Sequence, residues 1–404
     1  MKNFKSCSVI GLGYIGLPSA AVIADSKFEV IGVDLNPIIV NTVNNGETHI
    51  VEPNLDVLVK KVVQKGYLKA QTKPSESDVF LIAVPTPFKK KESNMPEPNT
   101  DYVMSAIDSI ISVLKPRDLI IIESTCPVGT TSMVRNFIAK KINFDINQVY
   151  IAYCPERVIP GNIIKELINN DRVIGGINTE SGEAAKRFYL MFCKGEILIT
   201  DDKTAEMVKL TENAFRDVNI AFANELSMIS DELNINIDEL IALSNHHPRV
   251  NILNSGCGVG GHCIAVDPWF IASRSPNKTP LIQTARRVND NKMQWVVNKI
   301  TEKSEKLEFK IKRKPIIGIL GLAYKSDVDD LRESPAVKIA NQLICNGEMI
   351  KICEPYINNH DTLEIFSLEE VLNKSDFVVA LVAHKMFKKI NLDSEKFLDF
   401  CGIF

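Results

Sequence analysis

The sequence predicts an α/β protein with two Rossmann-like, doubly wound lobes joined by a helical middle domain that contains one long central helix. Three observations lead to this prediction. A glycine-rich strand-to-helix turn opens the chain, a long proline-free stretch follows residue 200, and an alternating strand and helix pattern restarts near residue 315. At 404 residues the chain exceeds what one hydrophobic core usually holds. We therefore expect domains at 1–200, 201–310 and 311–404.

Composition and charge are those of an ordinary globular protein. The formal net charge is -3, so the chain as a whole attracts neither nucleic acid nor an anionic membrane. No apolar run approaches the roughly 20 residues that span a bilayer, and the N-terminal apolar stretch fits a strand, turn and helix better than a signal peptide. The nine cysteines contain no C-x-x-C pair, which disfavours a zinc knuckle. We expect a cytoplasmic protein without a metal.

The first lobe is predicted from short apolar runs that alternate with amphipathic stretches. None of these runs alternates polar with apolar residues, which is typical of a parallel sheet buried on both faces. The expected strands are Ser8–Ile10, Glu29–Val33, Val79–Ala83, Leu119–Glu123 and Val149–Tyr153.

A dinucleotide-binding fingerprint follows the first strand. Gly11, Gly13 and Gly16 form a G-x-G-x-x-G turn, and Asp34 ends the next strand. In this fingerprint the backbone approaches the pyrophosphate, whose charge is met by the helix N terminus. The Asp34 carboxylate would accept hydrogen bonds from ribose hydroxyls and repel a 2′-phosphate, so NAD is favoured over NADP. The alternative is an ordinary glycine turn with a solvated aspartate.

Two later strand ends carry hydroxyl groups where such sheets hold their ligands. Thr86 lies in "AVPTP" and Thr125 in "ESTCPVG". Either hydroxyl could equally cap a helix.

The middle domain is expected to begin with the long helix. Thr200, Asp201 and Asp202 offer N-cap chemistry. The following ~30 residues would form a helix of roughly 45 Å, too long for one compact lobe. Further helices are expected at Ile237–Ser244 and Leu281–Glu308.

The lysine-rich stretch 305–315 is expected to be a linker to the second lobe. After it we expect a strand in "PIIGILGLAYK", a helix around Pro335–Asn346, and strands in "MIKICEP" and "DFVVALVAH".

One face of the long helix carries three polar residues. Lys209, Asn213 and Arg216 are spaced i, i+4, i+7. Because Glu206 and Asp217 lie close to this stripe, the helix alone favours a solvated, salt-bridged face. The opposite, buried stripe is expected to contain Met207, Leu210, Ala214, Val218 and Ala221.

The stretch "GVGGHCIAVDPW" places Cys263 directly after a glycine-rich loop. Such a loop can present backbone N–H groups to an anion, which would favour the thiolate form of the cysteine. A buried, inert cysteine is an equal alternative. A metal site is disfavoured because the available ligands lack a two-by-two spacing; these are His246, His247, His262, Cys257 and Cys263.

Motifs along nearly the whole chain resemble the UDP-glucose/UDP-N-acetylhexosamine 6-dehydrogenase family. They occur in the family's order and read "GLGYIGLP", "AVPTP", "STCPVG", "CPERVIPG", "KLTENAFRDVNIAFANE", "HPRVN", "GVGGHCIAVDP" and "GLAYKSDVDDLRESP". "PERV", "FRDVNIA", "HPRVN" and "GGHCIAVDP" are most similar to the branch that acts on UDP-N-acetyl-D-mannosamine.

The resemblance implies an oxidation of the sugar 6-hydroxyl to a carboxylate with two NAD molecules. Cys263 would capture the 6-aldehyde, and the resulting thiohemiacetal would be oxidised to a thioester and hydrolysed. Lys209 would act as acid and base, Asn213 would donate to the same oxygen, and Asp267 would activate water. Glu156 and Thr125 would position water and the reacting centre.

The resemblance also implies the remaining contacts. NAD would meet Gly11, Gly13, Tyr14, Ile15, Gly16, Asp34, Thr86, Thr125 and Arg332. The UDP-sugar would meet Arg157, Val158, Lys209, Asn213, Arg216, His247, Arg249, Gly260, Tyr324 and Lys325. Arg249 would come from the neighbouring subunit of a homodimer built on the long helix.

Two positions depart from the family pattern. Cys257 stands where relatives commonly have proline, and Cys401 stands where they usually carry a basic residue. Three alternatives stay open: the same reaction on UDP-N-acetylglucosamine or UDP-glucose, a one-step hydroxyacid dehydrogenase that does not use the thiol, and a catalytically inactive nucleotide-binding scaffold.

Overall fold

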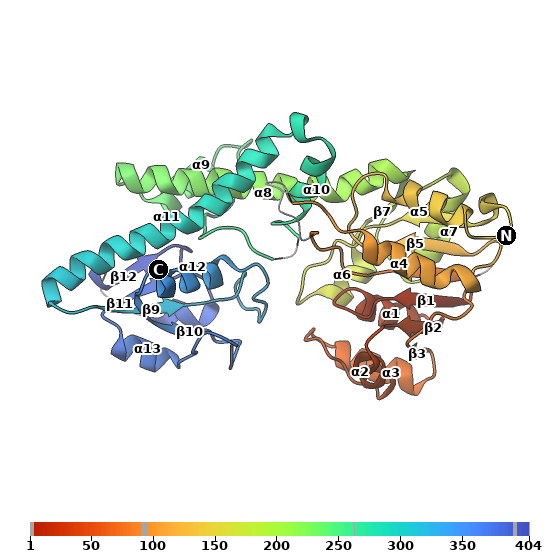
Figure 1. Ribbon diagram of the computed structural model, residues 1–404, viewed down its shortest axis with the longest axis horizontal. Helices are drawn as coiled ribbons and strands as arrows, with labels where there is room; N and C mark the ends of the chain where they lie inside the picture. The colour runs from red at the N-terminus through yellow and green to blue at the C-terminus, as the bar shows by residue number, and fades with distance from the viewer. Residues whose placement is uncertain (1–3, 90–95, 262, 391–393, 404) are drawn as a thin grey trace. The chain divides into compact units, whose positions relative to one another are not determined.

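The computed structural model describes residues 4–89, 96–261, 263–390 and 394–403 (Figure 1). The chain divides into two compact units. The first contains Met1–Thr211 and Trp269–Arg274, and the second contains Glu212–Pro268 and Ser275–Phe404. The three domain boundaries expected from the sequence stay a prediction.

The first unit is built on one eight-stranded sheet, in the order β3-β2-β1-β4-β5-β6-β7-β8 (Figure 1). All five strands expected from the sequence are present, and they pair in parallel. The expectation of a wholly parallel sheet is wrong at one edge, because β7 runs antiparallel to β6 and β8 follows the direction of β7. The strands are β1 (Ser6–Ile10), β2 (Glu29–Val33), β3 (Leu68–Gln71), β4 (Val79–Ile82), β5 (Leu119–Ile122), β6 (Tyr150–Tyr153), β7 (Arg172–Gly176) and β8 (Ile197–Asp201).

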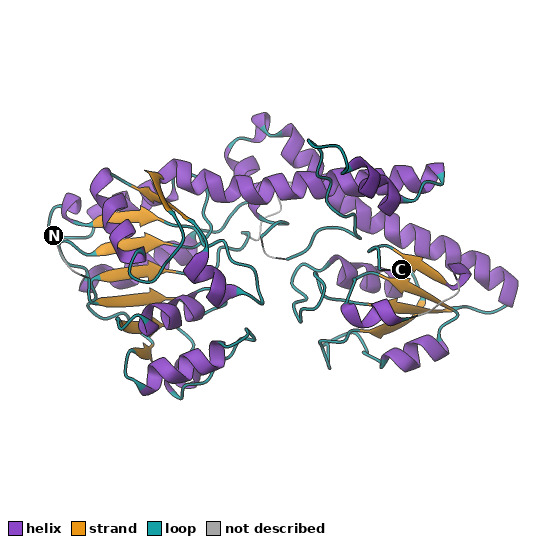
Figure 2. Ribbon diagram, turned by 180° about the vertical axis from the view of Figure 1, so that it is seen from behind, coloured by secondary structure: helices purple, strands orange, loops and turns teal. Residues whose placement is uncertain are grey.

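Helices cover both faces of this sheet (Figure 2). Successive strand residues point to opposite faces, so Val9 belongs to one hydrophobic core and Ile10 to the other. One core includes α1 (Gly16–Asp25), α2 (Pro37–Asn44), α3 (Leu55–Gln64) and α7 (Thr179–Tyr189), and the other includes α4 (Asp101–Ile110) and α5 (Thr130–Ala139). The short α6 (Ile163–Asn169) packs against α1.

The second unit contains a four-stranded parallel sheet, in the order β10-β9-β11-β12. One face packs against α11 (Pro280–Ile311) and α12 (Pro335–Cys345), and the other packs against α13 (Leu368–Lys374). The strands are β9 (Ile316–Leu320), β10 (Met349–Cys353), β11 (Phe377–Ala380) and β12 (Phe397–Asp399). The second unit also contains α9 (Ile237–Ser244), and α10 (Asp267–Arg274) begins in it but has its residues from Trp269 onward in the first unit. Short 3-10 turns occur at Ile111–Val113 and Ile146–Gln148 in the first unit, and at Pro276–Lys278, Lys385–Lys389 and Ser394–Lys396 in the second.

The long central helix is present as α8 (Asp202–Leu233), with 32 residues. Asp201 accepts hydrogen bonds from the Thr204 backbone N–H at 3.0 Å and from its hydroxyl at 2.6 Å, and these bonds lower the pKa of Asp201. The expected cap is thus confirmed. The expected buried stripe is wrong at Met207, which is 39% exposed, whereas Leu210, Ala214 and Ala221 are buried.

The expected linker at 305–315 is wrong. Helix α11 runs through most of it and ends at Ile311, followed by Lys312 in the left-handed conformation at φ 60°. No glycine or proline interrupts the stretch before Pro315, and Lys306 pairs with Glu302 one turn earlier at 2.6 Å. A lysine-rich composition alone therefore did not distinguish a linker from a solvated helix end.

The sequence predicted no membrane-spanning helix, no disulfide framework and no metal site, and each can be compared with the described residues. No helix among them is long and apolar enough to cross a bilayer. None of the nine cysteines, which all lie in the described part of the chain, forms a disulfide. No group of three or more potential ligands is placed to hold a metal there, and His262 lies outside the described residues.

Candidate active site

The strand ends of the first unit gather four of the expected site segments at one edge of the sheet. The register pairs Ile10 with Ile82, Ile82 with Ile122, and Ile122 with Tyr153. The glycine turn, Thr86, Thr125 and Glu156 follow these aligned positions within a few residues. The Ser124 hydroxyl donates to the Val84 carbonyl at 2.7 Å and ties two of the loops together. This carboxyl edge is where doubly wound sheets bind ligands.

The glycine turn has the geometry that a dinucleotide requires. Gly11 has φ +93°, and a Cβ on Gly16 would lie 1.8 Å from the Gly11 carbonyl oxygen. A Cβ on Gly13, in contrast, would meet no described heavy atom within 4 Å. The N-cap residue of α1, Ile15, makes no side-chain cap hydrogen bond. The turn therefore combines tight internal packing with an open surface at a helix N terminus, which fits a pyrophosphate.

Asp34 closes the turn. Its two carboxylate oxygens accept hydrogen bonds from the Leu12 N–H at 3.0 Å and the Asn36 N–H at 2.9 Å. Each oxygen has a second lone pair, so the carboxylate can still accept from ribose hydroxyls.

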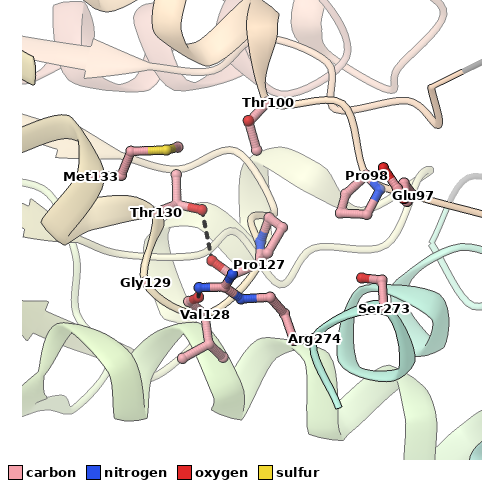
Figure 3. Close-up of a pocket in the computed structure, with 10 residues that line it drawn as sticks. All are labelled: Glu97, Pro98, Thr100, Pro127, Val128, Gly129, Thr130, Met133, Ser273 and Arg274. Atoms are coloured by element: carbon pink, nitrogen blue, oxygen red, sulfur yellow. Dashed lines mark hydrogen bonds between the residues drawn. The ribbon is translucent and has the colours of Figure 1, made fainter. Parts of the chain in front are cut away.

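A pocket of about 300 Å³ lies beside the loop that follows β5 (Figure 3). The Arg274 guanidinium donates to the Val128 carbonyl at 3.1 Å, and the Thr130 hydroxyl donates to the Pro127 carbonyl at 2.7 Å. The lining residues are Glu97, Pro98, Thr100, Pro127, Val128, Gly129, Thr130, Met133, Ser273 and Arg274. None of the site residues expected from the sequence lines it.

Glu206, which the sequence placed on a solvated face, is buried and caps α5. Its carboxylate accepts from the Gly129 N–H at 2.6 Å, the Thr131 N–H at 2.8 Å and the Thr131 hydroxyl at 2.7 Å. Burial raises the pKa of Glu206.

Glu156 lies three residues beyond β6 and is 9% exposed. One of its oxygens accepts from the Arg157 N–H at 2.7 Å, and the other lies 3.2 Å from an Nη of Arg172. The Arg157 guanidinium donates to the Asp171 carbonyl, and Val158 is half-buried. Arg172 was not recognised from the sequence, because its role depends on burial and on a partner from another segment of the chain.

The polar face of α8 is buried where the catalytic residues are expected. Lys209 is 8% exposed and Asn213 is 7% exposed, whereas Arg216 is exposed. The interpretation of a solvated face is therefore wrong for Lys209 and Asn213. Burying an amine and an amide on one helix face is costly unless they have polar partners, and Asn213 donates from Nδ2 to the Asp267 carboxylate at 2.5 Å.

Within the second unit, backbone hydrogen bonds connect Asp267 to Cys263. Asp267 begins α10 and is 3% exposed, and its N–H donates to the Cys263 carbonyl at 2.8 Å. The Val266 N–H donates to the same carbonyl at 3.0 Å. Cys263 itself is exposed, so the alternative of a buried cysteine is wrong, and the reactivity of its thiol stays a prediction. The structure thus joins Asn213, Asp267 and Cys263 through hydrogen bonds.

The glycine loop before Cys263 packs on the residues expected to bind UDP. A Cβ on Gly260 would lie 2.7 Å from Pro335, and a Cβ on Gly261, at φ +80°, would lie 2.9 Å from the Tyr324 ring. The Gly261 N–H donates to the Arg332 carbonyl at 3.1 Å. Burial raises the pKa of Tyr324, and Asp330 and Cys263 raise it further. Position 261 therefore has no room for a side chain beside the Tyr324 ring.

Several other expected contacts lie on exposed positions. Lys325, expected to meet the UDP-sugar, is exposed, and the guanidinium of Arg332, expected to meet NAD, is paired with Asp330. His247 and Arg249 lie on an exposed loop after α9, where the Arg249 N–H donates to His247 Nδ1 at 3.3 Å.

A buried polar network between α8 and α11 was missed from the sequence. Asp217 pairs with Arg286 at 2.6 Å, and Asn289 donates to the same carboxylate at 2.8 Å. Asn289 also accepts from Asn224 at 2.9 Å, and Asn224 accepts from the Gly256 N–H at 2.8 Å. The network therefore reaches the start of the glycine loop. The available signal was the spacing of polar residues three to seven apart on both helices.

The two departures from the family pattern lie in ordered surroundings. The buried Cys257 thiol donates to the Leu381 carbonyl at 3.4 Å. The Asp399 carboxylate accepts from the N–H groups of Cys401, Gly402 and Ile403 at 2.8–2.9 Å.

Comparison with protein families gives matches over nearly the whole chain. The NAD-binding, central and UDP-binding domains of the UDP-glucose/GDP-mannose dehydrogenase family match residues 5–193, 203–291 and 318–400.

Individual proteins are similar over the same length. A UDP-N-acetyl-D-mannosamine dehydrogenase of Campylobacter jejuni is 50% identical, covering 99% of this chain and 100% of its own. An NDP-N-acetyl-D-galactosaminuronic acid dehydrogenase of Ralstonia nicotianae is 46% identical over 97% of this chain and 93% of its own. The solved structure of a UDP-D-ManNAc dehydrogenase from Pyrococcus horikoshii has a TM-score of 0.90 at 38% identity, covering 99% of this chain and 96% of that one.

Proposed function

This chain belongs to the UDP-glucose/GDP-mannose dehydrogenase family, and from this premise we propose that it oxidises UDP-N-acetyl-D-mannosamine to UDP-N-acetyl-D-mannosaminuronate. The family's NAD-binding domain makes the chain an NAD-dependent oxidoreductase, and its UDP-binding domain indicates a UDP-sugar substrate. The choice of sugar rests on the 50% identity to the C. jejuni enzyme over the full chain.

The glycine turn and Asp34 would hold NAD. The open surface at Gly13 would receive the pyrophosphate, and Asp34 would accept from the ribose. NAD supplies the acceptor for one hydride in each of the two oxidations, so one sugar consumes two NAD molecules.

We infer that Lys209 takes the proton from the sugar 6-hydroxyl in the first oxidation, which yields an aldehyde. Cys263 then adds to the aldehyde carbon, forming a C–S bond and a thiohemiacetal. Lys209 and the Asn213 amide would stabilise the negative charge on the sugar oxygen. The second oxidation gives a thioester, and the sugar stays bound throughout.

Asp267 would accept a proton from the water that attacks the thioester, which releases the carboxylate and restores the thiol. The observation that carries this mechanism is the hydrogen-bonded set in which Asp267 binds the Asn213 amide and the Cys263 carbonyl. Thr125 and Glu156 would position water and the reacting centre.

We further propose a homodimer that forms on α8. Three large apolar side chains lie exposed on this helix at seven-residue spacing: Phe215, Phe222 and Ile229 are 67%, 51% and 45% exposed. Seven residues are close to two helical turns, so they share one face. An apolar face of this kind favours association, and Arg249 would then reach the partner's site from its exposed loop. The NAD and UDP-sugar contacts that the family resemblance implies are also part of the proposed function.

Counting NADH tests the reaction. UDP-N-acetylmannosamine, UDP-N-acetylglucosamine and UDP-glucose are each supplied in limiting amount with excess NAD. We expect two NADH per UDP-N-acetylmannosamine, the highest kcat/KM for this sugar, and loss of carboxylate formation in Cys263→Ser. One NADH per sugar with Cys263→Ser unchanged would instead support the one-step dehydrogenase.

A galactosamine-type sugar is the second candidate substrate. The 46% identity to the R. nicotianae enzyme favours it, and the same assay with UDP-N-acetylgalactosamine separates the two.

A further inference from the structure

A buried arginine connects Glu156 to a second carboxylate that the reaction does not use. Arg172 begins β7 and is 4% exposed. One of its Nη atoms lies 3.2 Å from Glu156 and 3.8 Å from Glu123, and the other donates to the Leu167 carbonyl at 3.0 Å. The guanidinium lies 4.5 Å from the centre of the Tyr189 ring. The Arg172 guanidinium is therefore held in place by carboxylates, a backbone carbonyl and an aromatic ring.

Glu123 forms the far end of this buried cluster. It is 4% exposed and follows β5 directly. Its carboxylate accepts from the Tyr189 hydroxyl at 2.7 Å and from the Ser19 hydroxyl of α1 at 3.4 Å. The cluster thus spans the dinucleotide-binding helix and the sheet edge where Glu156 lies.

The charges of the cluster do not balance if both carboxylates are ionised. Two carboxylates and one guanidinium would leave one buried negative charge, which is costly. The pKa of Glu123 is raised to about 7, mainly by burial and also by the charge of Glu156, while Arg172 opposes the rise. Burial also raises the pKa values of the neighbouring Cys7, Cys154 and Tyr189, which favours their neutral forms.

We propose that Arg172 is a positioning residue for the oxidation: it holds Glu156 as an oriented carboxylate, and Glu123 carries the proton that keeps the cluster neutral. The inference rests on the proposed role of Glu156. Both oxygens of Glu156 are fixed, one by the Arg157 N–H and the other by Arg172. Arg172 lies closer to Glu156 than to Glu123, so it acts on Glu156 rather than only neutralising Glu123.

The test is a double-mutant cycle in a background where the charge is already balanced. Glu123→Gln replaces the protonated carboxyl by an amide of similar shape, and we expect kcat to stay within roughly threefold of the wild type. Arg172→Met and Glu156→Gln are then introduced singly and together. Each is expected to lower kcat by roughly 10–100-fold, and the combination is expected to be no worse than the more impaired single change.

NAD affinity and the thermal midpoint, which are measured for every variant, show whether the first unit still folds. Arg172→Lys keeps the charge but not the planar fork, so its kcat should fall between those of Arg and Met. If Arg172→Met does not fold, a Lys variant as active as the wild type overturns the proposal.

The possible outcomes distinguish the proposed role of Glu156 from the proposed positioning role of Arg172. If Glu156→Gln is fully active, the proposed role of Glu156 fails, and the positioning role fails with it. If Glu156→Gln is impaired while Arg172→Met in the Glu123→Gln background is not, only the positioning role is wrong. Additive losses in the cycle would also contradict it.

The proton on Glu123 has its own readout. Because the folded pKa lies above the ordinary value of 4.5, the folded state binds the extra proton, and this contribution to stability is lost as the pH rises through about 7. Wild type should therefore lose stability relative to Glu123→Gln between about pH 5 and about pH 8. A difference that does not change with pH would show that Glu123 is ionised throughout.

Discussion

At the scale of single residues, two glycines of the α1 turn have opposite surroundings. A Cβ on Gly16 would collide with the Gly11 carbonyl at 1.8 Å, whereas a Cβ on Gly13 would meet no described atom within 4 Å. Gly16 thus serves the fold, and Gly13 leaves space beside the helix N terminus. The two positions allow protein stability to be separated from NAD binding.

We predict that Gly13→Ala folds normally but binds NAD weakly. Its free energy of unfolding should stay within about 0.5 kcal/mol of the wild type, while the Kd for NAD should rise at least about tenfold because the methyl group occupies the pyrophosphate surface. Gly16→Ala, the matched variant, should lose roughly 1–3 kcal/mol or more of stability. Urea unfolding and NAD titration measure both effects. Unchanged NAD affinity in Gly13→Ala would mean that the pyrophosphate lies elsewhere.

The sequence identified the residues whose chemistry is visible in a motif. Cys263, Asp267 and Asn213 lie in motifs of the resembling family, and the structure connects them through hydrogen bonds. Arg172 and Glu123 could not be recognised, because their roles depend on burial and on partners from distant strands. Lys209 illustrates the same limit: its helical spacing suggested a solvated face, but packing buries it.

At the scale of elements, α8 and α11 are connected by polar contacts. Lys292 of α11 is 2% exposed, donates to the Ser227 hydroxyl at 2.6 Å and lies 3.6 Å from the centre of the Trp295 ring. Burial lowers the pKa of Lys292 to about 7, against the smaller opposing effects of Cys257 and Asp231. An amine in this position titrates near neutral pH.

This buried amine predicts a pH-dependent stability. The folded pKa of about 7 lies below the ordinary 10.5, so above pH 7 the unfolded chain binds more protons and the stability rises with pH. Between about pH 7 and about pH 9 the wild type should gain stability relative to Lys292→Met. Lys306 is an exposed lysine of the same helix, so the difference in stability between the wild type and Lys306→Met should not change over this pH range. Parallel curves for wild type and Lys292→Met would indicate that Lys292 stays charged.

The sequence predicted the start of α8 and the bounds of α9 better than it predicted strand direction or the position of the linker. Helix α9 has the expected bounds, and α8 starts at its expected cap, since both follow from local cap chemistry and periodicity. The antiparallel pairing of β7 was not predictable, because strand direction depends on the path of the chain rather than on residue pattern. The end of α11 was expected to be a linker because residues 305–315 are rich in lysine, although no glycine or proline interrupts them before Pro315.

At the scale of the whole molecule, the proposed dimer makes the exposed apolar face of α8 a contact surface. Phe222→Glu should place a charge in this interface and reduce the mass in solution from twice 45.0 kDa to 45.0 kDa. Phe309→Glu, at a phenylalanine of α11 that is 79% exposed, should leave the mass unchanged. Light scattering after size exclusion measures both. Wild-type protein of 45.0 kDa at assay concentration would rule out the dimer.

A shared site predicts complementation between two inactive chains. Cys263→Ala and Arg249→Ala homodimers should each be inactive, but mixed dimers would contain one site with an intact Cys263 and the partner's intact arginine. After unfolding and refolding of an equal mixture, we expect activity of about a quarter of the wild type, since half of the dimers are mixed and each has one complete site. No recovery would mean that Arg249 serves its own subunit.

The covalent sugar intermediate is tested most directly by peptide mass spectrometry after rapid quenching with acid. Asp267→Asn, which should slow hydrolysis, is mixed with NAD and UDP-N-acetylmannosamine. We expect a UDP-sugar adduct on the peptide that contains Cys263, formed at the rate at which the second NADH appears. Complete four-electron turnover with no adduct on that peptide, and with Cys263→Ala still producing carboxylate, would contradict it.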